Sequence, residues 1–419
     1  MKKIITILIT ILSINLFAQE AKEVKKEDNP FKFTGQAYAY TATYNTTKKD
    51  EKMTFSAYRF RPYFSYIKEN VEATLKLEFD QFFGNGANEK YVKVGADTKN
   101  VVEVKAAYLL FNNVLAEGVF IKGGVDDYKT PGGFIVGTDV ALGILGYKWE
   151  KNYISAVYVK IEESNEKYNG DDAQMYGIDM SLTLPIITIR PAIYLIQGGK
   201  DITNKPWADS TAILPALTLS LKIDNIETVI SGTYATGKDK DANIKYSGYA
   251  TDIFVGYSID KEIKIGGFFT MLSGDNPDTT DKKEGFASFQ LKHDGFGRMF
   301  LLENQQTFSN IAADTFADIR MKTQGYMLFG ITGSAKFNII DVKFNIGYAN
   351  LMKETSATKT KKDLGFEADL SIGLEVQKNA KIVLDLAYLN TGKAFGTEGF
   401  GTNDTQNSMY TGLGMTLKF

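Results

Sequence analysis

Apolar and polar side chains alternate, residue by residue, in about eighteen successive segments between residue 31 and Phe419. The segment Val71–Asp80 is the clearest, because its odd-numbered residues are apolar and its even-numbered residues are polar or charged. Successive side chains of a β-strand point to opposite faces of the sheet, so each segment has one apolar and one polar face. Two kinds of all-β protein have this pattern: a soluble sandwich with an apolar interior, and a membrane barrel with an apolar exterior.

The amino terminus predicts export. Lys2 and Lys3 precede an apolar run from Ile4 to Phe17, which Ala18 and a polar stretch follow. This is the order of a secretory signal peptide. We therefore expect a signal peptide over residues 1–19 and a short periplasmic segment over residues 20–30. No later segment approaches the ~20 apolar residues that a membrane helix needs.

The connections between the alternating segments differ systematically in length, which favours the membrane barrel. The short ones are Ile67–Asn70, Glu150–Asn152, Leu184–Ile186, Asp224–Asn225, Asp260–Glu262 and Lys378–Ala380. Between them lie longer polar loops, at Tyr44–Glu51, Phe83–Asn100, Asp127–Val140, Glu163–Asp171, Gly198–Ser210, Gly237–Tyr246, Leu351–Lys362 and Thr391–Gln406. Outer-membrane barrels have short periplasmic turns and long extracellular loops. A soluble sandwich has no reason to segregate its loops in this way.

We therefore predict an all-β fold, a transmembrane antiparallel β-barrel over residues 31–419 with about 18 strands. A range of 16–20 strands stays open, because Gly285–His293 and Arg298–Thr307 also have strand character. These two segments would either extend the barrel to twenty strands or form a hairpin within one long outer loop, residues 274–323. Tyr and Phe residues of the outward parity near both strand ends are typical of aromatic girdles at the two membrane interfaces.

Charged residues are dense on the polar faces of the second to fifth segments. We expect nine of them to line the pore: Arg59, Arg61, Lys76, Glu78, Asp80, Glu103, Lys105, Lys122 and Asp126. A turn near Lys68-Glu69 would place Arg59 opposite Glu78 and Arg61 opposite Lys76. Two interpretations stay open: a constriction whose transverse field screens solutes, and a hydrated wall whose paired charges keep the strands in register. The mixed signs predict weak ion selectivity, with at most a slight preference for cations.

Two connections are candidates for narrowing the pore. The first contains Asp127, Tyr128, Lys129 and Pro131, and its Pro-Gly-Gly sequence predicts a turn. It can fold into the lumen as a constriction loop or cap the rim. The second is the long segment 274–323, which is an equally good candidate for a lid or plug.

Catalytic and cofactor sites have little support in the sequence. A nucleophile triad would need the single histidine, His293, as its base, and nothing marks its partners. Metal sites would lack cysteine and a second histidine, so we expect no metal and no cofactor. The net charge of −2 argues against a nucleic-acid partner.

The whole chain resembles bacterial outer-membrane porins, in particular large barrels related to the alginate-export and phosphate-selective groups. The resemblance rests on the signal peptide and on six segments: Tyr58–Pro62, Leu75–Gln81, Val102–Phe111, Phe120–Val136, Asp172–Leu182 and Met415–Phe419. The closing aromatic residue resembles the signal that the barrel-assembly machinery reads, and porins of this kind are commonly homotrimers.

The resemblance implies a channel in the bacterial outer membrane, in contact with its lipid, through which small hydrophilic solutes or ions diffuse passively. Loop constriction and mixed wall charges would sieve the solutes. The alternatives are a substrate-specific transporter of the fatty-acid-transporter type and a non-conducting surface or adhesive protein. An enzyme is disfavoured by the histidine argument.

Overall fold

The computed structural model describes residues 29–419 except residues 51, 86–100, 163–172, 199–209, 240–243, 290–295, 306–318, 357 and 402–403. The expected signal peptide, most of the expected periplasmic segment and His293 therefore lie outside the described residues. Within the described part of the chain, no helix is long and apolar enough to cross a membrane.

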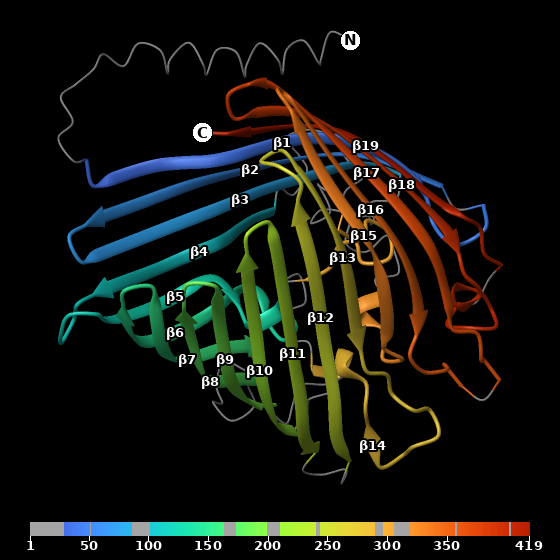
Figure 1. Ribbon diagram of the computed structural model, residues 1–419, viewed down its shortest axis with the longest axis horizontal. Helices are drawn as coiled ribbons and strands as arrows, with labels where there is room; N and C mark the ends of the chain where they lie inside the picture. Colours follow the sequence, from blue (N-terminus) through green and yellow to red (C-terminus); the bar gives the residue numbers. More distant parts are fainter. Residues whose placement is uncertain are drawn as a thin grey trace.

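Eighteen long strands make up one antiparallel sheet in the described residues, which confirms the predicted fold class (Figure 1). They are β1 (Phe31–Asn45), β2 (Lys52–Lys68), β3 (Val71–Asn85), β4 (Val101–Asn112), β5 (Val119–Lys129), β6 (Gly137–Trp149), β7 (Asn152–Glu162), β8 (Ala173–Thr183), β9 (Ile187–Gln197), β10 (Ser210–Ile223), β11 (Ile226–Asp239), β12 (Lys245–Ser258), β13 (Ile263–Leu272), β15 (Tyr326–Phe337), β16 (Ile340–Leu351), β17 (Asp363–Gln377), β18 (Ala380–Thr391) and β19 (Ser408–Lys418). A two-residue strand, β14 (Lys282–Lys283), pairs in parallel with the beginning of β12, outside this series.

The sheet closes on itself, because the first strand pairs with the last. β1 and β19 are antiparallel neighbours from Gln36, opposite Lys418, to Tyr44, opposite Tyr410. The backbone N–H of Gly35 donates to the carbonyl oxygen of Phe419 at 2.8 Å, which extends the seam to the last residue. A closed sheet has no free edge, so every strand in it can satisfy its backbone groups without water.

The two ends of the barrel differ in their connections, as predicted. At one end, tight turns join the strands, and five of them contain a non-glycine residue with a positive φ: Glu69, Glu150, Asp224, Asn338 and Asn379. Such a conformation is typical of the two-residue turns that match the twist of antiparallel strands. The long connections all lie at the opposite end. Because β1 begins and β19 ends on the short-turn side, the described chain starts and finishes there (Figure 1).

The outer face of the barrel is apolar. Leu75, Ile178, Val255 and Phe329 are exposed at outward positions of four different strands. Near the long-loop end, aromatic residues of the outward parity pair across neighbouring strands: Tyr234 with Tyr249, Phe269 with Phe329, Phe329 with Tyr348, and Tyr348 with Phe366. This row is the aromatic girdle that the sequence predicted, and it is what a bilayer interface favours.

The register between β2 and β3 corrects one prediction. Lys68 lies opposite Val71, so the turn has only two residues, and Arg59 lies opposite Asp80 rather than Glu78. The expected register had a four-residue turn, because Ile67 and Lys68 were assigned to it. Glu69 adopts a φ of 50°, which closes the chain in fewer residues and shifts the whole pairing by two positions.

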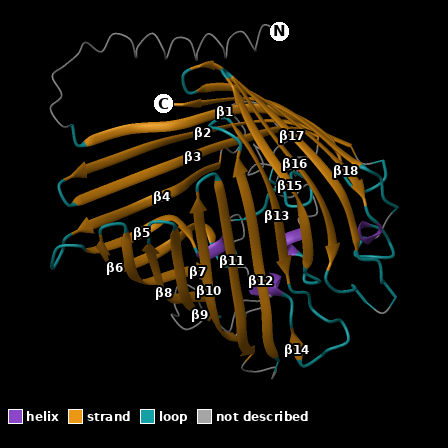
Figure 2. Cartoon of the chain, in the orientation of Figure 1, coloured by secondary structure: helices purple, strands orange, loops and turns teal. Residues whose placement is uncertain are grey.

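The two segments with strand character inside residues 274–323 do not extend the barrel in the described residues. Phe286–Phe289 is a short 3-10 helix, and residues 296–305 form turns (Figure 2). β13 pairs directly with β15 across this insertion. The side chains of Phe286, Met299 and Leu302 are fully buried, so the apolar residues that mimic a strand pattern serve packing inside the barrel.

Candidate pore and its constriction

The predicted pore-lining residues form two groups of ion pairs on the inner faces of β2 to β5, one around Glu78 and one around Asp126. Arg59 reaches both Asp80, at 2.5 Å from its Nε, and Glu78, at 3.2 Å. Arg61 also binds Glu78, on the adjacent strand. Glu78 is therefore a shared acceptor for two arginines, and its side chain is only 2% exposed. The alternation in the sequence placed these groups on one face, and the register brings them into contact.

Lysine side chains form the next row of the same wall. Lys105 lies 3.6 Å from Glu78, 3.3 Å from Glu103 and 3.1 Å from Asp139, a β6 residue that the sequence analysis did not select. Lys76 lies 3.7 Å from Asp126. Lys122 also binds Asp126 and sits over the Tyr108 ring at 4.1 Å. Asp139 was missed because it falls in a segment assigned to a loop, where the face of a residue cannot be inferred.

Two lysines of this wall are more exposed than the carboxylates Glu78 and Asp126. The side chains of Lys76 and Lys105 are 34% and 26% exposed, against 2% for Glu78 and 11% for Asp126. Glu103 and Asp139, at 50% and 28%, are the exposed acids of the wall, and Arg59, at 3%, is its buried cation. The wall thus presents lysine ammonium groups to the lumen, above carboxylates that hold them in place.

The connection between β5 and β6 packs against the inner faces of distant strands. Phe134, Ile135 and Val136 are fully buried. The 3-10 turn Pro131–Gly133 contacts β9, β10 and β11 on the far side of the barrel from β2. Tyr128 and Lys129 lie at the end of β5, where Lys129 is still paired with Gly137 of β6.

Polar contacts fix this hairpin to the wall. The Arg190 guanidinium on β9 donates to the backbone oxygen of Lys129 at 2.8 Å and to Asp179 at 2.7 Å. The Tyr128 hydroxyl donates to the same aspartate at 3.2 Å. Asp127 lies opposite Asp139 in the hairpin. Arg190 and Asp179 are thus the wall residues that hold the tip, and nothing in the local sequence marks them for that role.

A described part of the segment 274–323 also lies inside the barrel. Its residues Phe296–Gln305, here called the lumen segment, contact β12, β15, β16 and β17. The Arg298 guanidinium binds Asp252 on β12 at 2.6 and 2.8 Å, and its backbone oxygen accepts a bond from Asn345 on β16 at 3.1 Å. Tyr326 on β15 donates to Glu303 at 2.7 Å. The prediction of one outer loop is therefore incomplete, because part of this segment lies inside the barrel.

The two inward connections meet. The ring of Phe134, from the hairpin between β5 and β6, lies 5.1 Å from the ring of Phe296 and 6.3 Å from that of Phe286. All three side chains are buried. This aromatic contact joins the hairpin to the lumen segment across the barrel, so both narrow the same level of the lumen.

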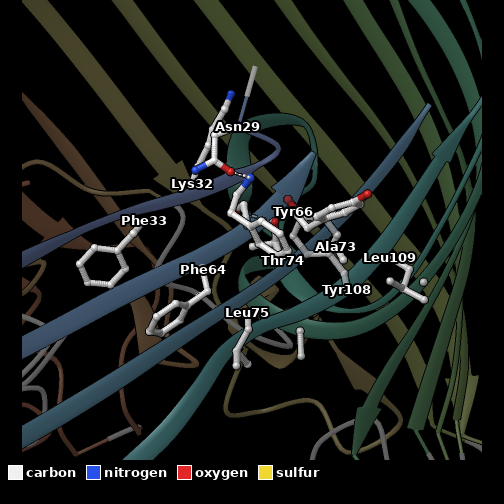
Figure 3. A pocket seen from close by; sticks show the side chains of 14 residues that line it. Asn29, Lys32, Phe33, Phe64, Tyr66, Ala73, Thr74, Leu75, Tyr108 and Leu109 are labelled. Atoms are coloured by element: carbon white, nitrogen blue, oxygen red, sulfur yellow. Dashed lines mark hydrogen bonds between the residues drawn. The ribbon is translucent and has the colours of Figure 1, made fainter. Parts of the chain in front are cut away.

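A separate hollow of about 800 Å³ opens at the short-turn end, over β1 to β5 (Figure 3). Its apolar lining includes Phe33, Phe64, Leu75 and Leu109, which have the outward parity of their strands. These side chains face the side of the wall on which the lipid-facing residues lie. Ser65, Thr74 and Tyr108, which have the inward parity, also line it.

No protein-family model and no curated protein matches this sequence. Solved structures do match over nearly the whole chain. OccAB1 of Acinetobacter baumannii has a TM-score of 0.58 at 10% identity, covering 96% of this chain and 99% of its own. OccK5 (OpdH) of Pseudomonas aeruginosa has a TM-score of 0.55 at 12% identity, covering 92% and 98%. A BenF-like porin from Pseudomonas fluorescens Pf-5 has a TM-score of 0.57 at 9% identity, covering 94% and 99%.

The fold is that of a bacterial outer-membrane porin. At such low identity the similarity shows that this chain shares the barrel architecture, and it assigns no role to any residue. The finer resemblance to alginate-export and phosphate-selective porins has no support in these structures, which belong to the Occ and Opd channels of Pseudomonas and Acinetobacter. The porin fold accounts for the closed sheet, the apolar exterior and the segregated connections described above.

Proposed function

We propose that this porin-fold chain is a channel of the bacterial outer membrane through which small hydrophilic solutes diffuse passively. The observation that carries the proposal is the partly exposed charged wall of β2 to β6, facing a lumen that two inward connections narrow. A narrowed, charged lumen restricts solutes by size and by charge.

We further infer that the passage favours small organic anions. The ammonium groups of Lys76 and Lys105 reach the lumen surface, while their respective partners Asp126 and Glu78 are less exposed. One similar structure is described as OpdK of Pseudomonas aeruginosa with vanillate, an aromatic carboxylate. The slight cation preference inferred from the sequence counted all charges equally, whereas solutes meet the exposed ones.

Single-channel recording tests the proposal. Purified protein is placed in a planar bilayer with a potassium chloride gradient. We expect stable open steps. We also expect the reversal potential to have the sign of the chloride equilibrium potential. A reversal potential of the opposite sign contradicts the anion preference and leaves the channel function standing.

A silent bilayer from folded protein contradicts the channel function itself. Folding is checked separately, by the shift in gel mobility between unheated and heated samples and by circular dichroism. Folded but silent protein would favour the alternative of a non-conducting surface protein. Uptake of one solute into proteoliposomes without measurable ion steps would favour a substrate-specific transporter instead.

A further inference from the structure

Five consecutive backbone N–H groups of the lumen segment, from Arg298 to Leu302, donate to side-chain carboxylates. Glu303 accepts the first two, from Arg298 at 2.6 Å and Met299 at 3.1 Å. Successive N–H groups that point to one side form a concave anion site. Because the segment has no strand partner for these groups, the carboxylates replace the backbone acceptors that regular structure would supply.

The other three N–H groups are satisfied by the barrel wall. Phe300 donates to Asp369 at 3.1 Å, and Leu301 and Leu302 donate to the two oxygens of Glu367 at 2.6 and 2.8 Å. Glu367 and Asp369 are two residues apart on β17 and both point into the lumen, where they are 0% and 4% exposed. Bonds between a carboxylate and backbone N–H groups are among the stronger hydrogen bonds in proteins.

The charged groups around this pair are otherwise engaged. Arg298 binds Asp252, and Arg320 donates to the backbone oxygen of Phe296. Among the described residues, no lysine or arginine lies within ion-pair distance of Glu367 or Asp369. Two carboxylates buried side by side without a cation are costly to a membrane barrel. The N–H groups of the lumen segment offset part of that cost.

Building on the proposed function, we propose that Glu367 and Asp369 are positioning residues that hold the lumen segment across the pore and so set its cross-section. We call this pair the carboxylate latch. The lumen segment is not part of the barrel wall, since β13 and β15 pair without it. Weakening the latch should therefore displace the segment while the barrel stays closed.

The variant Glu367→Gln/Asp369→Asn tests the latch with little change in side-chain size. Each amide keeps one oxygen and turns the other acceptor into an NH2 group, which cannot accept a bond from the N–H groups that face it. Glu375→Gln is the matched control, because Glu375 is on the inner face of the same strand near the short-turn end. We expect larger single-channel conductance in the double variant and an unchanged step size in the control.

A cysteine at Met299 reports the position of the segment without relying on conductance. The chain has no native cysteine, and Met299 is fully buried. We expect a membrane-impermeant maleimide to label Met299→Cys about tenfold faster in the latch variant than with the native latch, because lost hydrogen bonds increase local opening. Equal labelling rates in the two backgrounds would overturn the proposal.

A second cysteine at Gly347 provides the rescue. A Cβ atom at Gly347, on the inner face of β16, would lie 3.2 Å from the Met299 sulfur. Bridging Met299→Cys to Gly347→Cys with a short thiol-specific linker should return the latch variant to the native step size. If the step size of the latch variant stays larger than the native one after bridging, the pore is wider for another reason, and this result contradicts the latch.

The two proposals fail in different ways. If native protein and variant are both silent in the bilayer, the channel function fails, and the labelling rate still decides whether the latch exists. If both conduct with the same step size and label at the same rate, the latch fails and the channel function stands.

Discussion

Neighbouring residues of one strand face lipid and water in turn, and this determines which substitutions each position tolerates. Leu75 is 39% exposed on the apolar exterior, whereas Lys76 lies on the inner wall near Asp126. We expect Leu75→Arg to lower the free energy of unfolding by up to about 2–4 kcal/mol, the range for a cation at the bilayer midplane. The measurement is a urea titration of refolding in phospholipid vesicles.

Lys76→Leu is the control for this substitution. Lys122 also binds Asp126, so the carboxylate keeps a cation and the barrel should fold normally with altered conductance. Equal tolerance of the two substitutions would mean that the inner and outer faces have been interchanged.

The buried carboxylate of Glu78 sets the charge that solutes meet. It compensates Arg61 and Lys105, whose ends are more exposed than its own. In Glu78→Gln the side chain keeps its size and loses one negative charge, so the wall should become more attractive to anions. The reversal potential under a salt gradient should move toward the chloride potential, and an unchanged value would show that the ions pass elsewhere. Glu375→Gln, on β17, is the matched control and should shift the reversal potential less.

At the scale of elements, the hairpin between β5 and β6 depends on a wall residue that is distant in sequence. Arg190 binds Asp179 and the Lys129 backbone with the same guanidinium. Lysine keeps the charge but loses this two-sided geometry. We therefore expect Arg190→Lys to fold, to free the hairpin tip and to increase the conductance.

The control for this element is Lys222→Arg, which makes the reverse exchange on β10 at the short-turn end, near Glu227. Its conductance should match the native value. If Arg190→Lys also conducts like the native protein, the hairpin tip is held by Tyr128 and its apolar contacts instead.

At the scale of the whole molecule, closure depends on the seam between β1 and β19. The ring of Phe419 stacks on that of Phe60 at 5.8 Å and lies 5.5 Å from that of Phe33. We expect Phe419→Ala to lower stability in detergent by about 1–2 kcal/mol, the scale of two aromatic pairs. Thermal unfolding measures this, and Phe337→Ala, an exposed aromatic away from the seam, is the control.

The same variant tests the proposed contact with the barrel-assembly machinery. If the terminal aromatic residue is read as a signal in cells, Phe419→Ala should reduce the amount of assembled barrel far more than its stability in detergent explains. A loss of assembly no greater than that of Phe337→Ala would remove Phe419 as a signal.

The alternation of side chains by itself determined the strands, their faces and the closed barrel. Apart from the seam between β1 and β19, the long strands pair with their neighbours in sequence, and a period of two fixes which residues share a face. For this reason Arg59, Glu78 and Lys105 were predicted on one wall. The register failed by two residues only where the length of one turn was misjudged.

The tertiary structure alone decided what fills the lumen. Residues 130–136 and 296–305 have no regular hydrogen-bonding partner, so no periodicity reveals where they go. Their positions depend on Arg190, Asp252, Glu367 and Asp369, which lie on strands far away in sequence and look like ordinary wall residues. A contact between an irregular segment and a distant strand leaves no local pattern, and such contacts set the width of this pore.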